Sequence, residues 1–299
     1  MEKRIPPFLK QGDKVSIIST ARKIDREIVE KACVIFDSKG LIPEPGKSLF
    51  NAYHQYAGSD KERAEDLQNA IDDPEIKAIF CARGGYGTVR LLDIVNWKNF
   101  QLNPKWICGY SDVTALHARS AFLGVASLHS TMPINYANNP KEIIDRTFDS
   151  LFGKGNTYSW ESKQTEDNQE CCGVICGGNL SVIYSLLGSA DQLKTKGRIL
   201  FLEDLDEYLY HIDRMMMALK RAGLLSELAG LVVGGMTDMN DNEVPFGKNP
   251  EEIIHEAVKD YNYPVFFDFP SGHIDNNNPI IMGKEAQLRF KKGKGDFSQ

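Results

Sequence analysis

Residues 106–117 have the sequence WICGYSDVTALH, an apolar run that passes through a glycine turn into a helix-forming segment. This pattern is typical of a buried strand that stops at a sharp turn, where a helix begins. Such a turn would lift the Ser111 hydroxyl clear of the sheet, facing the first N–H groups of the helix. Because the motif lacks the second glycine of G-x-S-x-G, simple helix capping by Ser111 or Asp112 is the competing interpretation.

A second strand-to-helix turn precedes this one. The apolar run at residues 78–82 leads into Arg83-Gly84-Gly85-Tyr86-Gly87, as expected for a strand covered on both faces. Upstream, a β-branched run at 14–20 and helical patterns over 25–38 and from Ser59 onward continue the alternation. The alternation predicts an α/β fold in which helices flank a parallel sheet.

The pattern changes after about residue 153. Residues 153–170 are polar and weakly patterned, which is typical of a linker. Strand-like runs follow at 173–176, 198–202, 231–235 and 264–269. We therefore predict a first domain at residues 1–153, a linker at 154–172 and a second domain at 173–299.

Composition narrows the classes of partner and location. The 35 Lys and Arg residues are outnumbered by 41 Asp and Glu, for a net charge of −6, so nucleic acid is not an expected partner. No apolar run is long enough to span a membrane, and no apolar export segment follows Met1. Most of the six cysteines lie inside apolar runs, which favours a reduced, cytoplasmic protein. Cys171-Cys172-x-x-x-Cys176 lacks a zinc-ligand spacing and is interpreted as structural.

A nucleophilic serine needs a base and a group that orients the base. His273 and Glu203 each come directly after an apolar strand-like run, where catalytic side chains are commonly presented. The alternatives are a surface histidine for His273 and a solvated helix start for the acids after Glu203. A metal site is another interpretation of the acidic run 203–207 with His211 and Asp213, but the run matches no specific metal pattern.

The glycine-rich turn has two interpretations. Phosphate binding is one, although the turn lacks both the G-x-G-x-x-G spacing and the Walker lysine. The other is an oxyanion hole, in which an N–H near Gly85 and the N–H of Asp112 hold a tetrahedral oxyanion.

Five ordered motifs carry a resemblance over residues 7–290. Together they resemble the LD-carboxypeptidase family of serine peptidases, which includes murein tetrapeptide carboxypeptidases and microcin-immunity peptidases. The resemblance implies Ser111 as nucleophile, His273 as general base and Glu203 as the residue that orients it. It also implies a Rossmann-like N-terminal domain, a β-rich, swivelling-barrel-like C-terminal domain, a cleft between them, no metal or cofactor, and a homodimer. The motifs are Arg83-Gly84-Gly85-Tyr86-Gly87, Gly109-Tyr110-Ser111-Asp112, Gly177-Gly178-Asn179-Leu180, Leu202-Glu203-Asp204 and Gly272-His273.

The implied activity is release of a C-terminal D-alanine from murein tetrapeptide during cell-wall recycling. Arg83 is a candidate for binding the terminal carboxylate, and a structural ion pair is the alternative. An immunity-type peptidase that cleaves peptidyl or aminoacyl nucleotides, and a non-catalytic binding module, are the other hypotheses. The chain departs from the family pattern at 19–23, where an Ala-Pro-Ser turn is frequent, and in the polar loop 275–278.

Overall fold

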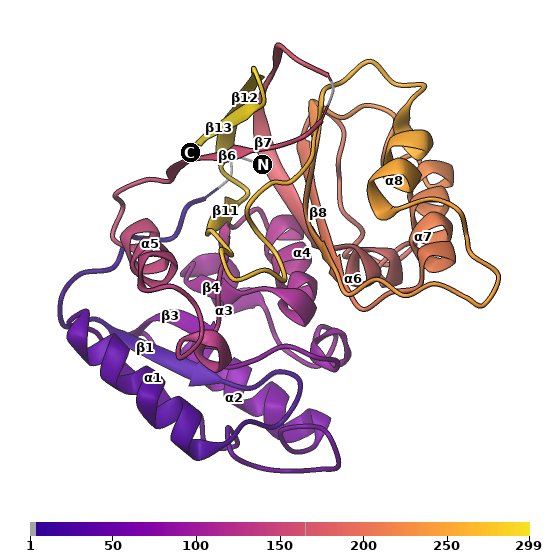
Figure 1. The fold of residues 1–299 in the computed structure, drawn as a ribbon. Helices are drawn as coiled ribbons and strands as arrows, with labels where there is room; N and C mark the ends of the chain where they lie inside the picture. The colour runs from indigo at the N-terminus through magenta and orange to yellow at the C-terminus, as the bar shows by residue number, and fades with distance from the viewer. Residues whose placement is uncertain (1–3, 165) are drawn as a thin grey trace. The chain divides into compact units, whose positions relative to one another are not determined.

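The computed structural model describes residues 4–164 and 166–299, and the chain forms two compact units (Figure 1). The first unit comprises Met1–Gly155 together with Asn278–Gly283. The second comprises Asn156–Asn277 and Lys284–Gln299. In the described ranges, no helix is both long and apolar enough to cross a membrane.

The first unit is built on a six-stranded sheet in the order β11-β5-β4-β3-β1-β2. All neighbouring strands are parallel except β11, which pairs antiparallel with β5. The predicted α/β fold with a parallel N-terminal sheet is thus confirmed. The strands are β1 (Lys14–Ile18), β2 (Ile42–Pro45), β3 (Ile76–Cys81), β4 (Trp106–Gly109), β5 (Ser127–His129) and β11 (Ile280–Met282).

Helices cover both faces of this sheet. On one face, α1 (Arg26–Ser38) and α5 (Lys141–Leu151) bury a cluster in which Phe36 contacts Phe80 and Phe148, with ring centroids 4.7 and 5.3 Å apart. Helices α2 (Asp60–Asp72) and α4 (Thr114–Phe122) pack against the sheet strands as well, and α3 (Lys98–Leu102) packs against α2. Helix α2 begins with a capping box, in which Ser59 and Glu62 exchange hydrogen bonds, as the Ser59-Asp60-Lys61-Glu62 sequence favours.

The second unit contains a seven-stranded mixed sheet in the order β10-β9-β8-β7-β12-β13-β6. Strands β10, β9, β8 and β7 are parallel, and the remaining pairs are antiparallel. Helices α7 and α8 lie side by side (Figure 1). The elements are β6 (Thr157–Glu161), β7 (Gln169–Asn179), α6 (Leu180–Ser185), β8 (Ile199–Leu205), α7 (Leu209–Arg221), β9 (Gly230–Thr237), α8 (Pro250–Val258), β10 (Val265–Phe266), β12 (Glu285–Lys291) and β13 (Lys294–Ser298).

Side chains join the two ends of this second sheet. Trp160 on β6 donates from its Nε1 to the carbonyl oxygen of Phe267, just after β10, at 3.0 Å. The Phe267 N–H in turn donates to Gln164 Oε1 at 2.9 Å. The sheet therefore curls toward closure, as a β-rich, barrel-like unit requires.

Two segments differ from the expected boundaries. Residues 154–172, expected as a linker, contain β6 and the start of β7. The pattern of β6 was weak because only Tyr158 and Trp160 face the core, and its partner β13 lies far away in sequence. Residues Asn278–Gly283, expected in the second domain, belong to the first unit because β11 covers the open edge of β5.

Gly177 on β7 tests the pairing of the second sheet. A Cβ at this position would lie 1.9 Å from the Phe201 carbonyl oxygen of β8, and the backbone φ is +133°. We expect Gly177→Ala to lower the free energy of unfolding by about 3 kcal/mol or more. Gly188→Ala is the control, because its φ is +78° but no atom lies within 4 Å; strain alone should cost about 1 kcal/mol.

Urea unfolding followed by circular dichroism compares the two variants. Equal unfolding midpoints would contradict the predicted clash. If Gly177→Ala aggregates and Gly188→Ala does not, the larger destabilisation of Gly177→Ala is supported as well.

Candidate active site

Ser111 lies at the strained turn that the sequence predicts. Strand β4 ends at Gly109, and Ser111 begins a 3₁₀ helix (Ser111–Val113) that continues into α4. The backbone φ of Ser111 is +62°, a left-handed conformation that is uncommon for a residue with a side chain. A Cβ on Gly109 would lie 2.9 Å from Val113 Cγ2, so glycine is needed for the turn to close. Strain held at a half-buried serine points to a functional site.

His117 on α4 braces the strand before this turn. Its Nε2 lies 2.9 Å from the Gly109 carbonyl oxygen and must donate, so Nδ1 accepts from the Ser127 hydroxyl at 2.8 Å. Burial lowers the pKa of His117 to about 4, despite the bond to Gly109. His117 is therefore neutral near pH 7 and structural.

The glycine-rich loop after β3 passes directly beside Ser111. A Cβ on Gly84 would stand 2.9 Å from Ser111 Cβ, 3.0 Å from its Oγ and 3.5 Å from the Asp112 nitrogen. Only glycine permits this close approach. The next residue, Gly85, has a φ of +118°, which also favours glycine.

Asp112 ties this loop to the serine turn. Its buried Oδ2 accepts a 2.8 Å hydrogen bond from the N–H of Thr88, the first residue of a 3₁₀ helix (Thr88–Leu91). Burial raises the pKa of the Asp112 carboxyl, and its bonds to Thr88 only partly offset this effect. The side chain thus serves as a brace, which leaves its main-chain N–H as the predicted oxyanion donor.

Arg63 is a buried residue that the sequence analysis missed. Its Nη1 donates to the carbonyl oxygens of Thr20 and, at 3.1 Å, Gly87, while Nη2 pairs with Asp60. The guanidinium therefore connects the loops that follow β1 and β3. Its position one residue before Ala64, on the buried side of α2, was the available signal: a charged residue there needs internal partners.

Arg83 is half-buried and turned toward the β1 loop. Its Nη1 donates to the Lys23 carbonyl oxygen at 3.0 Å. Burial, followed by the positive charge of Arg22, lowers the pKa of Arg83. This hydrogen bond gives Arg83 a structural contact, but the partner is a main-chain carbonyl oxygen rather than the carboxylate of an ion pair.

Glu203 and His273 meet in the second unit. His273 Nδ1 lies 2.5 Å from Glu203 Oε2, with Glu203 fully buried and His273 12% exposed at the side chain. Glu203 lies within β8, two residues before the strand ends, rather than past its end as the sequence suggested. Gly272 permits the approach, because a Cβ there would lie 2.7 Å from Glu203 Cβ.

The loop that carries His273 is held by Asn277, another residue that the sequence analysis left unassigned. The Asn277 Oδ1 accepts from the Ser271 hydroxyl at 3.1 Å and from the Gly272 N–H at 2.8 Å. Thr237 on β9 donates its hydroxyl to the His273 carbonyl oxygen at 3.1 Å. Part of the polar loop 275–278 is therefore structural.

The acidic run after Glu203 does not converge on a common point. Asp204 accepts from Asn179 Nδ2 and from the Ser181 N–H, while Glu207 bonds His211 Nδ1 at 2.6 Å. Burial, followed by the charge of Glu203, raises the pKa of Asp204 to about 7. Across residues 4–164 and 166–299, no three His, Cys, Asp or Glu side chains form a metal-binding group, and Cys171, Cys172 and Cys176 are free thiols.

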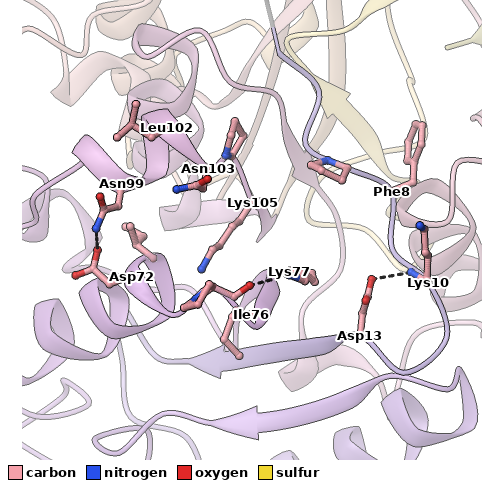
Figure 2. Close-up of a pocket in the computed structure, with 14 residues that line it drawn as sticks. Phe8, Lys10, Asp13, Asp72, Ile76, Lys77, Asn99, Leu102, Asn103 and Lys105 are labelled. Carbon is pink, nitrogen blue, oxygen red and sulfur yellow. Dashed lines mark hydrogen bonds between the residues drawn. The ribbon is translucent and has the colours of Figure 1, made fainter.

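A cavity of about 550 Å³ lies elsewhere on the first unit (Figure 2). It is lined at the amino ends of the strands, by Asp13 before β1, Ile76 at the start of β3 and Lys105 before β4. Lys105 Nζ caps α2 through the carbonyl oxygens of Ala70, at 2.7 Å, and Asp73. Since Ser111 follows the opposite end of β4, this cavity is separate from the candidate site.

The structure thus brings some predicted residues together. Ser111, Asp112 and the Gly84–Gly85 loop form one cluster in the first unit, and Glu203 and His273 form another in the second.

The charge on Glu203 should control the titration of His273. Burial acts to lower the pKa of His273, but the charge and hydrogen bond of Glu203, with a further contribution from Asp204, raise it above the usual value. Glu203→Gln should therefore lower this pKa, so that His273 becomes neutral at a lower pH. The measurement is an NMR titration of the imidazole signals. Glu207→Gln, which removes the partner of His211 instead, is the control; an unchanged His273 pKa in Glu203→Gln would contradict the account.

Comparison with known proteins assigns the family. A model described as the LD-carboxypeptidase N-terminal domain matches residues 15–130, and one described as the C-terminal domain matches residues 172–288. A probable murein peptide carboxypeptidase of Bacillus subtilis is 31% identical over 95% of this chain and 91% of its own. Murein tetrapeptide carboxypeptidase of Pseudomonas aeruginosa is 28% identical over 92% of each.

Solved structures share the fold. Muramoyltetrapeptide carboxypeptidase from Oxalobacter formigenes superposes with a TM-score of 0.87 at 23% identity, covering 95% of this chain and 98% of the other. The microcin C7 self-immunity protein MccF gives 0.86 at 20% identity, covering 98% of both. At these identities the likeness concerns the fold, whereas the sequence relatives and domain models establish kinship: the chain belongs to the LD-carboxypeptidase family.

Proposed function

We propose that this protein is a serine carboxypeptidase that cleaves the amide bond between an L-configured centre and a C-terminal D-amino acid. Its substrate would be murein tetrapeptide, and the released product D-alanine, in cytoplasmic cell-wall recycling. The observation that carries the proposal is the buried Glu203–His273 hydrogen bond of 2.5 Å in a chain whose other unit holds a strained serine.

The proposed chemistry follows from that bond. Glu203 accepts from Nδ1 of His273, so the base would act through Nε2. Ser111 Oγ attacks the carbonyl carbon as His273 takes its proton, and the tetrahedral intermediate collapses as His273 returns a proton to the departing amine. A water molecule, activated by the same base, then hydrolyses the acyl-enzyme. The steps need no metal or cofactor.

Main-chain donors would stabilise the oxyanion. The N–H groups of Gly85 and Asp112 are the proposed pair. The close approach of Gly84 to Ser111 Oγ supports this assignment, because it brings the loop that carries Gly85 next to the proposed nucleophile. Asp112 and Arg63 would hold this loop in place before substrate arrives. Preorganised donors of this kind are typically worth about 10² to 10³ in rate each.

The unit that contains Met1–Gly155 and Asn278–Gly283 is proposed to supply the nucleophile, and the unit that contains Asn156–Asn277 and Lys284–Gln299 is proposed to supply the base. A homodimer is also proposed, and light scattering at several concentrations would test it.

A second candidate function has one observation in its favour. Tyr86, within the glycine-rich loop, and Tyr56 have ring centroids 6.4 Å apart, and Tyr86 is 48% exposed. Exposed aromatic rings can stack a base, as an immunity-type peptidase acting on aminoacyl nucleotides would require. A binding module without catalysis is the remaining alternative.

Incubation with murein tri-, tetra- and pentapeptides, followed by mass spectrometry, tests the function. We expect D-alanine release from the tetrapeptide alone. Ser111→Ala should lower kcat by on the order of 10⁴ or more with the fold intact, because it removes the nucleophile. Ser226→Ala, which removes an exposed hydroxyl, is the control. Wild-type turnover by Ser111→Ala would contradict the triad, and cleavage of an aminoacyl nucleotide alone would favour the second candidate.

Gly84→Ala tests the geometry around the nucleophile. The added Cβ would crowd Ser111 Cβ and Oγ at 2.9 and 3.0 Å, so Ser111 must move. We expect kcat to fall by about 10², since small misplacements of reacting groups cost this much. D-alanine release and circular dichroism are the readouts, with Gly12→Ala, where nothing lies within 4 Å, as the control. A folded Gly84→Ala with wild-type kcat would show that Ser111 is not the nucleophile in this position.

A further inference from the structure

Arg22 lies over the glycine-rich loop. It is an exposed residue in the turn after β1, and it is one of the positions at which the sequence departs from the family pattern. A Cβ on Gly85 would lie 2.6 Å from Arg22 Cδ, 2.7 Å from its Cγ and 2.9 Å from its Nε. The arginine side chain therefore packs against the residue proposed to donate to the oxyanion.

The topology makes this edge of the sheet a binding position. From β1 the chain turns to β2 on one side and later to β3 on the other, so the strand order reverses between β1 and β3. In open α/β sheets, ligands bind outside the carboxyl ends of the strands at such a switch point. Arg22 follows β1 and Arg83 follows β3, so the two arginines flank it.

Two positive charges meet here. Burial, followed by the positive charge of Arg22, lowers the pKa of Arg83, while the charge of Asp25 acts to raise it. Within the described residues, no hydrogen bond or ion pair engages the Arg22 side chain, and Arg83 Nε is buried without a partner. Guanidinium groups bind carboxylates with paired, charge-assisted hydrogen bonds. The Arg22 side chain and Arg83 Nε therefore provide donors for an anion.

The spacing suits one particular anion. In a peptide substrate, the terminal carboxylate carbon is three bonds of about 1.3 to 1.5 Å from the scissile carbonyl carbon. A group that binds this carboxylate must therefore lie within a side-chain length of the oxyanion donors. Arg22 meets this condition through Gly85, whereas Arg83 Nη1 is already engaged with the Lys23 carbonyl oxygen.

We propose that Arg22 is the residue that binds the terminal carboxylate of the peptide substrate, with Arg83 as its supporting partner. This specificity role rests on the proposed function and names the group that makes the enzyme a carboxypeptidase. It reassigns to Arg22 the part first considered for Arg83.

Binding to Ser111→Ala tests the proposal without turnover. Isothermal calorimetry compares a murein tetrapeptide that ends in D-alanine with its C-terminal carboxamide. We expect the carboxylate form to bind about 10 to 100 times more tightly, because a charge-assisted pair is lost in the amide. Adding Arg22→Gln should abolish this preference, and Arg22→Lys should restore part of it. Lys31→Gln, which removes an exposed charge paired with Glu27 on α1, is the matched control and should keep the preference.

Steady-state kinetics of the Arg22 variant in the active protein, which retains Ser111, supply a second readout. Arg22→Gln should raise KM for the tetrapeptide about 10- to 100-fold and change kcat little, since carboxylate binding precedes the chemical step. A retained preference, or equal weakening of both peptides, would overturn the assignment. Failure of Ser111→Ala to bind either peptide would also overturn it. So would a calorimetric result in which Arg22→Gln keeps its affinity for both peptides but loses affinity for adenosine monophosphate, because that loss would indicate phosphate recognition.

Failure of the proposed function would look different. If the carboxylate preference depends on Arg22 but the wild-type protein releases no D-alanine, the site stands and the reaction does not. If D-alanine is released and the Arg22→Gln variant keeps its preference, the reaction stands and the assignment of Arg22 is wrong.

Discussion

The hydrogen bond from the Thr88 N–H to the buried Asp112 carboxylate is the contact on which the first cluster depends. It joins the turn after β4 to the loop after β3, and so holds Gly84 against a serine whose backbone is strained. Parallel strands end along one edge of a sheet, so these loops start as neighbours. Arg63 extends the same brace to the loop after β1. Strain at Ser111 persists because several contacts oppose its relaxation.

In the second unit, two consecutive carboxyl groups, those of Glu203 and Asp204, are buried. The pairing of β8 with β9 shifts register between Leu202 and Asp204, where these groups lie. Glu203 contacts His273, while Asp204 accepts from Asn179 and from the Ser181 N–H at the start of α6. Hydrogen-bond donors to both oxygens of Asp204 and to Glu203 Oε2 limit the cost of removing these groups from water, while Glu203 Oε1 is buried without a partner. Burial, followed by the charge of Glu203, raises the pKa of Asp204. Burial acts to lower the pKa of His273, but the charge and hydrogen bond of Glu203 raise it.

Local patterns predicted much of the fold and of the site. Apolar runs that end in glycine turns located β3 and β4, and the capping box located α2. The pairing of Glu203 with His273 was expected from their positions after apolar runs and from the family resemblance, and the structure contains that contact. Arg63 was missed, and Arg22 and Asn277 were noted only within segments that depart from the family pattern, because nothing beside these residues in sequence indicates what they contact. The strands β6 and β11 were missed because each takes its place through a partner distant in sequence.

The sequence by itself determined the class of fold, the places where strands stop, and the residue types available at each stop, because periodicity and glycine positions act within a few residues. Only the tertiary structure decided which strand ends become neighbours, since strand order is set by long-range packing. That order placed Arg22 on Gly85 and Gly84 on Ser111. It also turned Arg83 toward a backbone carbonyl, a contact no local pattern encodes.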